Sequence, residues 1–155
     1  MPGTIDAKLA ELGIALPAPT APIANYVPYV VANGLVVISG QLPMVDGRLA
    51  CAGKLGAGVT VAEGQAAARQ CFINVLVHLR AACGGDLDRV RQVVRLGGFI
   101  ACLGDFTQHA AVMNGASDLA VAVFGAAGRH ARSTIGVPSL PVDAAVEVEG
   151  IFLIG

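Results

Sequence analysis

The pattern of apolar and polar positions predicts a chain of strands interrupted by two long helices. The run YVVANGLVVISG at 29–40 indicates two strands joined at Asn33-Gly34, the dipeptide that most strongly predicts a tight hairpin turn. Short segments rich in β-branched and apolar residues predict three further strands, at about 93–102, 132–137 and 144–154.

The first long helix has a clear start and a clear end. Thr60 followed by Glu63 forms a capping box, and the pair Gly84-Gly85 stops the helix after about Cys83. One face of this helix is apolar, with Ala68, Cys71, Phe72, Val75 and Leu79. The other face carries a polar row, Glu63, Gln70, Asn74 and His78, on which we expect His78 to be solvated or hydrogen-bonded.

Two more helices complete the prediction. Asp105 or Gln108 is expected to cap a helix that runs to about Val123 and ends at glycines. A short N-terminal helix is expected over 4–13, capped by Thr4 or Asp6 and ended by Gly13.

The order strands, helix, strand, helix, strands is typical of an α+β fold with its helices on one face of a sheet. The stretch LPAPTAPIAN at 16–25 is Pro-rich and predicts an extended arm. We therefore divide the chain into an N-terminal helix and arm, residues 1–19, and one main domain, residues 20–155.

The composition favours an oligomer. Of the 155 residues, 55% are hydrophobic and only 14% are charged, against about 25% charged in an average soluble domain. Such a chain has more apolar surface than a small monomer buries, and obligate interfaces resemble a domain core. The alternative is a monomer with an Ala- and Gly-rich surface.

Composition also weighs against several classes of function. A net charge of −1, no basic run and 5% aromatic residues disfavour nucleic-acid binding. No segment reads as a membrane span, because the longest candidate, residues 61–83, carries Glu63, Arg69 and Arg80. The N-terminus lacks the basic and apolar regions of a signal peptide, so we expect a cytoplasmic protein. Four cysteines without metal-site spacing predict reduced thiols, mostly buried, and no zinc.

Charged residues in the last two predicted strands are the candidate site. Glu147 and Glu149 share a face of the final strand, because side chains alternate along it. Arg132 opens the preceding strand, so the arginine and a glutamate approach one another if the two strands pair. The competing interpretation is an ordinary structural ion pair or an exposed edge.

Several motifs together resemble a known family. They are SGQLP at 39–43, the helix that begins after Thr60, MNGASDLAVAVFG at 113–125, HARSTIGV at 130–137 and LPVDAAVEVE at 140–149. In this order they are similar to the Rid family, the reactive intermediate deaminases formerly called YjgF or L-PSP proteins. The resemblance covers about residues 20–155 and implies a chorismate-mutase-like fold, with a mixed sheet and two long helices on one face. It also implies a homotrimer with ligand clefts between subunits.

The resemblance implies hydrolysis of 2-imino acids, or their enamine tautomers, to 2-keto acids and ammonia, with no metal or organic cofactor. Arg132 matches the arginine that pairs with the substrate carboxylate, and Glu147 matches the glutamate that holds the attacking water. Three further residues match positions in the ligand cleft: Tyr26 an aromatic residue, Gly40 a glycine whose carbonyl faces the substrate nitrogen, and Thr134 a residue whose backbone contacts the carboxylate. Asn114 matches an asparagine near the cleft that supports its loop. The partners expected are a small carboxylate-bearing metabolite and further copies of this chain, not nucleic acid or membrane.

The chain also departs from the family pattern. Ala24-Asn25-Tyr26 replaces a Gly-Pro-aromatic sequence, His130 replaces a proline, and an insert near 47–60 adjoins the expected cleft. His130 is either a polar loop residue or a ligand contact. These departures leave open a non-catalytic binder of small carboxylates, a regulator or sensor. A third reading, an endoribonuclease, lacks a basic patch and a recognisable pair of catalytic histidines. A serine nucleophile at Ser133 is disfavoured, since no motif supplies a base for it.

Overall fold

The computed structural model describes residues 2–19 and 24–155, so part of the Pro-rich arm at 16–25 lies outside the described residues. The helices are α1 (Thr4–Glu11), α2 (Val61–Ala82) and α3 (His109–Phe124). The main strands are β1 (Tyr29–Ala32), β2 (Leu35–Gln41), β7 (Val90–Ala101), β8 (Ala131–Val137) and β9 (Val146–Ile154). Short strands β3 (Met44–Val45), β4 (Arg48–Leu49), β5 (Lys54–Leu55) and β6 (Gly58–Val59) occupy the segment before α2.

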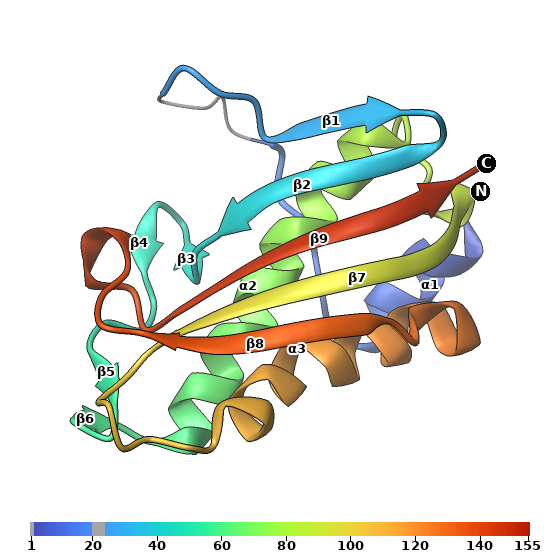
Figure 1. Cartoon of the computed structure of the whole chain (residues 1–155). Helices are drawn as coiled ribbons and strands as arrows, with labels where there is room; N and C mark the ends of the chain where they lie inside the picture. The colour runs from blue at the N-terminus through green and yellow to red at the C-terminus, as the bar shows by residue number, and fades with distance from the viewer. Residues whose placement is uncertain (1, 20–23) are drawn as a thin grey trace.

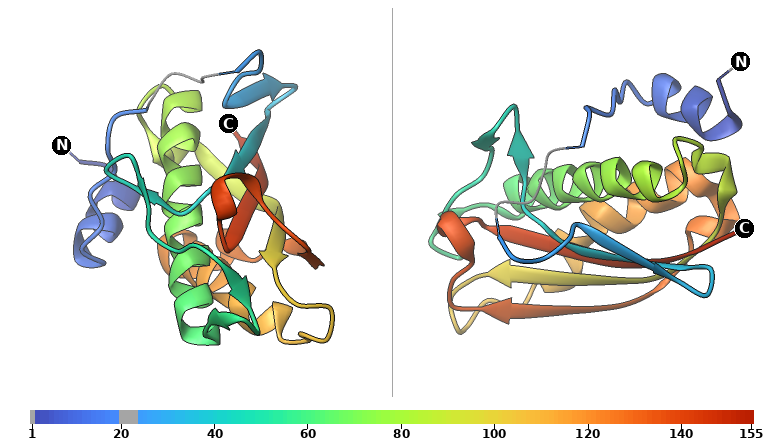
Figure 2. Two further views of the ribbon diagram at one scale, coloured as in Figure 1. Left: turned by 90° about the vertical axis from the view of Figure 1, so that its left-hand side faces the viewer. Right: turned by 90° about the horizontal axis from the view of Figure 1, so that it is seen from above.

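The five main strands form one mixed sheet in the order β1-β2-β9-β7-β8. Neighbouring strands are antiparallel except β7 and β8, which run parallel. Both long helices lie on one side of the sheet and leave the other side open, as the views in Figures 1 and 2 show. The predicted α+β, chorismate-mutase-like fold with a mixed sheet and two long helices on one face is confirmed. The last two strands do not pair, because β7 lies between β8 and β9, so the condition under which Arg132 would approach a glutamate of the same chain is not met.

The hydrophobic core lies between α2, α3 and the sheet. The predicted apolar face of α2 is fully buried at Ala68, Cys71, Phe72, Val75 and Leu79. Alternate residues of β9 point toward the helices, since Val146, Val148 and Phe152 are buried while Glu147 and Glu149 are not. The Thr60–Glu63 capping box forms as predicted, with both of its reciprocal hydrogen bonds.

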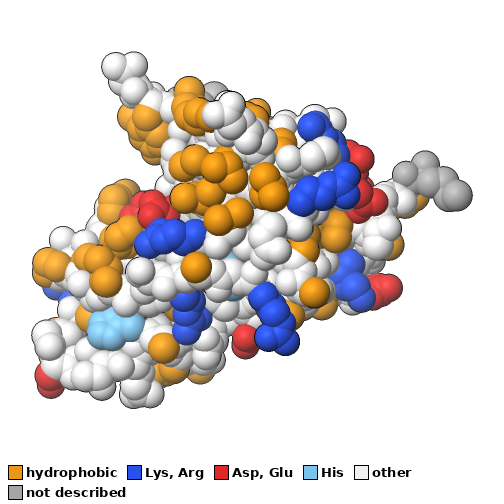
Figure 3. All heavy atoms as spheres, turned by 45° about the vertical axis from the view of Figure 1, so that its right-hand side comes forward, with side chains coloured by type: hydrophobic (Ala, Val, Ile, Leu, Met, Phe, Trp, Pro, Cys, Tyr) orange, Lys and Arg blue, Asp and Glu red, His pale blue; other side chains and the backbone are white. Residues whose placement is uncertain are grey.

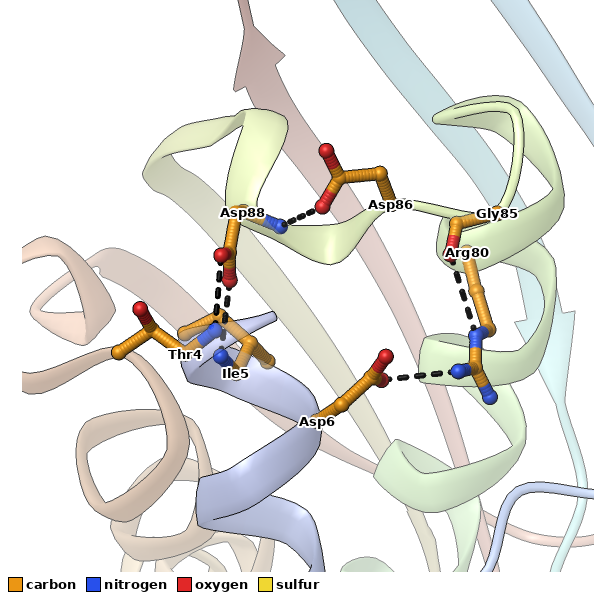
Figure 4. A network of polar contacts seen from close by, with 7 residues as sticks. All are labelled: Thr4, Ile5, Asp6, Arg80, Gly85, Asp86 and Asp88. Atoms are coloured by element: carbon orange, nitrogen blue, oxygen red, sulfur yellow. Dashed lines mark hydrogen bonds and ion pairs between the residues drawn. The ribbon is translucent and has the colours of Figure 1, made fainter. Parts of the chain in front are cut away.

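The N-terminal helix is part of this packed unit. Leu9 and Ile14 are buried in the common core. Thr4 and Asp6 do not cap the helix with their own side chains: the Asp88 carboxylate accepts from the backbone N–H groups of Thr4 and Ile5, both at 2.8 Å (Figure 4). These bonds lower the pKa of Asp88. Asp6 instead pairs with Arg80 of α2 at 2.8 Å.

The start of α3 also differs from the prediction. Gln108 occupies the position before the helix, but no side chain caps it. By length and composition alone, the segment His109–Gly128 is long and apolar enough to cross a membrane, which differs from the expectation that no segment reads as a span. Val112, Met113, Ala116, Leu119, Ala120 and Val123 of this segment are buried in the core, whereas Val121 is exposed.

We expect Gly115→Ala to destabilise the fold, because Gly115 lies where α3 crosses α2. A β-carbon at this position would clash with the backbone carbonyl of Gln65, which has no room to retreat within its own helix. Forcing such an overlap costs about 1–3 kcal/mol, which urea denaturation would measure as a lower midpoint with an unchanged slope. Gly104→Ala is the control, because a β-carbon there meets nothing within 4 Å. Equal stabilities of the two variants would contradict this account of the helix crossing.

Candidate functional site

Arg132 is held on the helix side of the sheet by α3. It lies opposite Leu96 of β7, a core residue, so its side chain points toward the helices. Nη1 donates to Asn114 Oδ1 at 2.8 Å and to Ser117 Oγ at 2.9 Å, and Nη2 lies 3.4 Å from the Ala110 carbonyl. Among the described residues Arg132 forms no ion pair. Its charge is therefore available to an anion at this edge of the sheet.

His130 supports Arg132 through a chain of hydrogen bonds. Its Nδ1 lies 2.6 Å from the Gly128 carbonyl and must donate, since a carbonyl oxygen only accepts. In the neutral ring Nε2 then accepts from the Ser117 hydroxyl at 2.8 Å, leaving the Ser117 oxygen to accept from Arg132. Both ring nitrogens are thus engaged, which favours the structural reading of His130 over the ligand contact. Ser117 was missed by the sequence reading, although it lies one helical turn after Asn114.

Thr134 lies on the same side of β8 as Arg132, two residues along the strand. Its hydroxyl is buried and has no hydrogen-bond partner among residues 2–19 and 24–155. Arg132, Asn114 and Thr134 therefore share one edge of the molecule, formed by β8 and α3.

Glu147 lies on the opposite, open side of the sheet. It pairs with Phe99 of β7, whereas its neighbour Val148 points into the core. Half-burial raises the pKa of the Glu147 carboxyl, and the charge of Glu149 adds to the shift. Gly40, at an irregularity of β2, lies directly against this carboxylate, because a β-carbon there would overlap it. The structure thus brings together Glu147 and Gly40.

The neighbours of Glu149 differ from those of Glu147. Arg95 of β7 lies on the same open face, with its Nη1 3.6 Å from Glu149 Oε1. The cation beside Glu149 is therefore Arg95 and not Arg132. The sequence reading missed it, because the pairing of β7 with β9 is a long-range contact that the local pattern does not specify.

A cleft of about 600 Å³ adjoins Gly40. Its walls include Tyr26, Gly40, Asn74, Val77 and His78, and we call it the His78 cleft. Of the insert near 47–60, Gly47 lies on its wall. His78 is buried rather than solvated, and its Nδ1 has no hydrogen-bond partner among the described residues, so the prediction for this residue was wrong. Pro17 and Ala18 of the N-terminal arm lie on the walls of the same cleft, so residues distant in the sequence contribute to the surroundings of His78.

The site residues thus fall into two groups that do not meet within one chain. Arg132, Asn114 and Thr134 belong to the β8 edge on the helix side. Glu147 lies on the open side, and Gly40 and Tyr26 belong to the far edge of the sheet, beyond β9. One small molecule cannot contact Arg132 and Glu147 of the same chain, because the sheet separates them.

No three His, Cys, Asp or Glu side chains gather into a potential metal site in the part of the chain that the structure describes. All four cysteines are free thiols in the structure. Cys71 and Cys83 are buried, whereas Cys51 and Cys102 are partly exposed.

Comparisons with known proteins give a consistent result. The family model described as "YjgF/chorismate_mutase-like, putative endoribonuclease" matches residues 6–152. The chain is 50% identical over 150 residues to Protein TCP17 of Trypanosoma cruzi, which covers 96% of this chain and 93% of that protein. The structure resembles Atu1372, a protein of unknown function from Agrobacterium tumefaciens, with a TM-score of 0.91 and 44% identity over 97% of this chain and 92% of that one. The YjgF gene product from E. coli matches with a TM-score of 0.62 and 28% identity over 88% of this chain and 92% of that one.

Proposed function

Because this chain belongs to the YjgF/chorismate-mutase-like family, we propose that it hydrolyses 2-imino acids, or their enamine tautomers, to 2-keto acids and ammonia. Two groups carry the proposal: Arg132, which has no carboxylate partner in the described part of the chain, and Glu147, a half-buried carboxyl with a raised pKa. No metal or organic cofactor takes part in the proposed reaction.

Arg132 is the proposed anchor of the substrate carboxylate. A guanidinium presents a planar set of donors that matches a carboxylate, and charge-assisted bonds of this kind are stronger than neutral ones. Asn114 and Ser117 hold the Nη1 side of the group by hydrogen bonds of 2.8 and 2.9 Å. This fixed geometry reduces the entropy lost on binding.

Glu147 is the proposed base. It takes a proton from water as the water oxygen adds to the imine carbon, and the carbon–nitrogen double bond becomes single. The proton then passes to nitrogen, which gives a carbinolamine. Glu147 next moves the hydroxyl proton of this intermediate to the amino nitrogen, the carbon–nitrogen bond breaks, ammonia leaves, and the carbon–oxygen bond becomes the keto group. A raised pKa lies nearer to neutral pH than that of an ordinary glutamate, which suits a group that both accepts and returns a proton. The Gly40 carbonyl is the proposed acceptor of a hydrogen bond from the substrate nitrogen.

The proposed site is shared between copies of the chain in a homotrimer. Within one chain the two groups lie on opposite sides of the sheet, so an Arg132 must come from one copy and a Glu147 from the next. The open side of the sheet supports association, because no helix covers it and its exposed apolar residues include Leu35, Val37, Ile135 and Leu153. Figure 3 shows hydrophobic side chains gathered among arginine and lysine residues on this side.

We expect Val37→Glu to break the assembly. The valine is 47% exposed in the single chain and lies on the open side between Val30 and Ile151, where a carboxylate would be buried without a partner in the trimer. Sedimentation equilibrium should give the trimer mass for the wild type and the monomer mass for the variant. Val121→Glu is the matched control, because Val121 is 38% exposed on α3. A wild-type monomer, or a variant that stays trimeric, would contradict the proposed interface.

The direct test is ammonia release. A panel of 2-imino acids is generated in the cuvette by an amino-acid oxidase, and hydrolysis is followed with and without purified protein. Acceleration by the wild type that scales with protein concentration supports the deaminase. No acceleration on any member of the panel rules it out.

The alternative is a non-catalytic binder of small carboxylates. This function is favoured by Arg132, which forms no ion pair among the described residues. Its expected result differs from that of the deaminase: the ligand binds without turnover, and binding is lost in Arg132→Ala but kept in Glu147→Ala. The endoribonuclease named in the family description remains the weaker candidate, because the chain has no basic run and a net charge of −1.

A further inference from the structure

Cys102 and His109 pair a nucleophile with a base, and neither belongs to the site described above. The Cys102 Sγ lies 3.6 Å from the His109 Nε2, within hydrogen-bonding distance for sulfur. In the neutral tautomer that carries its proton on Nδ1, the Nε2 of the ring accepts the thiol proton. Both residues are partly exposed. The pair therefore has the composition of an activated thiol, in which an adjacent base generates the thiolate.

Three separate segments of the chain bring these atoms together. Cys102 follows β7, His109 is the first residue of α3, and Gly136 belongs to β8. A β-carbon at Gly136 would lie 2.6 Å from the His109 Nε2 and 2.7 Å from the Cys102 Sγ, so both reactive atoms converge beside an exposed residue that has no side chain. The start of a helix carries a positive partial charge, which favours a thiolate near it.

The other three cysteines lie in different surroundings. Burial raises the pKa of the partly exposed Cys51, and the negative charge of Glu63 raises it further. Cys71 and Cys83 are buried in the core, which raises the pKa of both thiols. The thiolate and not the thiol is the nucleophile. We therefore expect these three cysteines to react slowly in the folded protein.

We propose that Cys102, with His109 as its base, is a modification site that exchanges with small disulfides such as oxidised glutathione. The thiol proton passes to the His109 Nε2, and the Cys102 sulfur attacks one sulfur of the disulfide. The sulfur–sulfur bond of the small molecule breaks, and the thiolate that leaves takes the proton from His109. Cys102 becomes a mixed disulfide and one small thiol is released, so the disulfide itself is the oxidant.

The competing interpretation is a packing contact at the end of β7. Cys102 packs against the hydrophobic core, and the His109 ring meets the Phe106 ring edge to face, with 5.2 Å between the ring centroids. A sulfur that is only packed there would react no faster than Cys51. Two thiols of the same chain, both partly exposed, therefore distinguish the two interpretations.

The test measures mixed-disulfide formation in the folded protein at neutral pH. The protein is incubated with an excess of oxidised glutathione, and peptide mapping by mass spectrometry follows each cysteine with time. We expect Cys102 to react about 10²-fold faster than Cys51, the lower end of what a positioned base contributes to a proton transfer. A reducing agent should remove the adduct. Unmodified Cys71 and Cys83 report that the protein has stayed folded, since both are buried.

Two variants separate the base from the exposure of the sulfur. His109→Gln keeps a polar side chain but removes the base, so it should slow Cys102 to about the rate of Cys51. Gln108→Ala is the matched control, because Gln108 is exposed and directly precedes the helix. It should leave the rate at Cys102 unchanged.

The result at Cys102 does not depend on whether the protein hydrolyses imino acids. Equal rates at Cys102 and Cys51, or a fast reaction at Cys102 that survives in His109→Gln, would overturn the proposal. If His109→Gln also exposes Cys71 and Cys83, that variant has unfolded. The comparison of Cys102 with Cys51 in the wild type then decides, because it needs no substitution.

Discussion

Arg132→Ala should reduce kcat/KM for every 2-imino acid by about 30- to 4,000-fold, because removing one partner of a hydrogen-bonded charge pair costs about 2–5 kcal/mol. Most of the loss should appear in KM, since the guanidinium binds a carboxylate that does not itself react. Arg132→Lys keeps the charge but loses the planar pair of donors, so it should fall between the wild type and the alanine variant. Steady-state kinetics on the imino-acid panel measures all three.

Arg129→Ala is the matched control for this experiment. It removes the same charge three residues earlier, from an exposed side chain outside the site. We expect wild-type kinetics from it. A similar loss of kcat/KM in Arg132→Ala and Arg129→Ala would show that the positive charge of this region as a whole, and not a specific contact with Arg132, attracts the substrate.

Glu147→Gln should lower kcat by about 10²- to 10⁴-fold with little change in KM, because it removes the proton acceptor and keeps the shape of the side chain. In the wild type, activity should fall as acid protonates Glu147, and the raised pKa places this loss above the usual range for a glutamate. If activity falls at low pH only around the ordinary pKa of a glutamate, or if Glu147→Gln keeps the wild-type kcat, then a group other than Glu147 is the base.

Glu147→Gln lowers activity in this account, but it should not lower the stability of the folded protein at neutral pH. Because the folded-state pKa of Glu147 is raised, folding favours its protonated form, and stability is greatest below the unfolded pKa. This stability is lost as the pH rises through the folded pKa and the carboxylate ionises. At neutral pH, Glu147→Gln should therefore melt at the wild-type temperature or above it, whereas near pH 4 the two proteins should converge. A Tm below the wild type at neutral pH would mean that ionised Glu147 contributes to folding.

The sequence predicts those features that depend on neighbouring residues. The hairpin at Asn33-Gly34 and the capping box at Thr60 follow from local hydrogen bonds, and the buried face of α2 follows from helical spacing. Arg132, Thr134, Glu147 and Asn114 lie in the strands and the helix that the sequence predicts for them. Their proposed roles come from the family resemblance.

Long-range contacts account for what the sequence reading missed. The position of β7 between β8 and β9 separates Arg132 from Glu147 and brings Arg95 to Glu149. Likewise His78 belongs to a polar row on α2 and is expected to be solvated, whereas the structure buries it beside a cleft whose walls include Pro17 and Ala18 from the distant N-terminal arm. The order of strands in a sheet and the packing of a distant segment are tertiary features. The spacing of apolar residues within one helix or strand does not specify them.

The central claim is that Arg132 of one copy and Glu147 of the next form one deaminase site, and subunit complementation tests it most directly. Arg132→Ala and Glu147→Ala chains are coexpressed with different tags, and trimers that carry both tags are purified. Neither variant alone should release ammonia from imino acids. In a mixed ring of three, one interface combines an intact Arg132 with an intact Glu147, so the mixed protein should recover about a third of the wild-type rate. A mixed trimer as inactive as its parents would contradict a shared site.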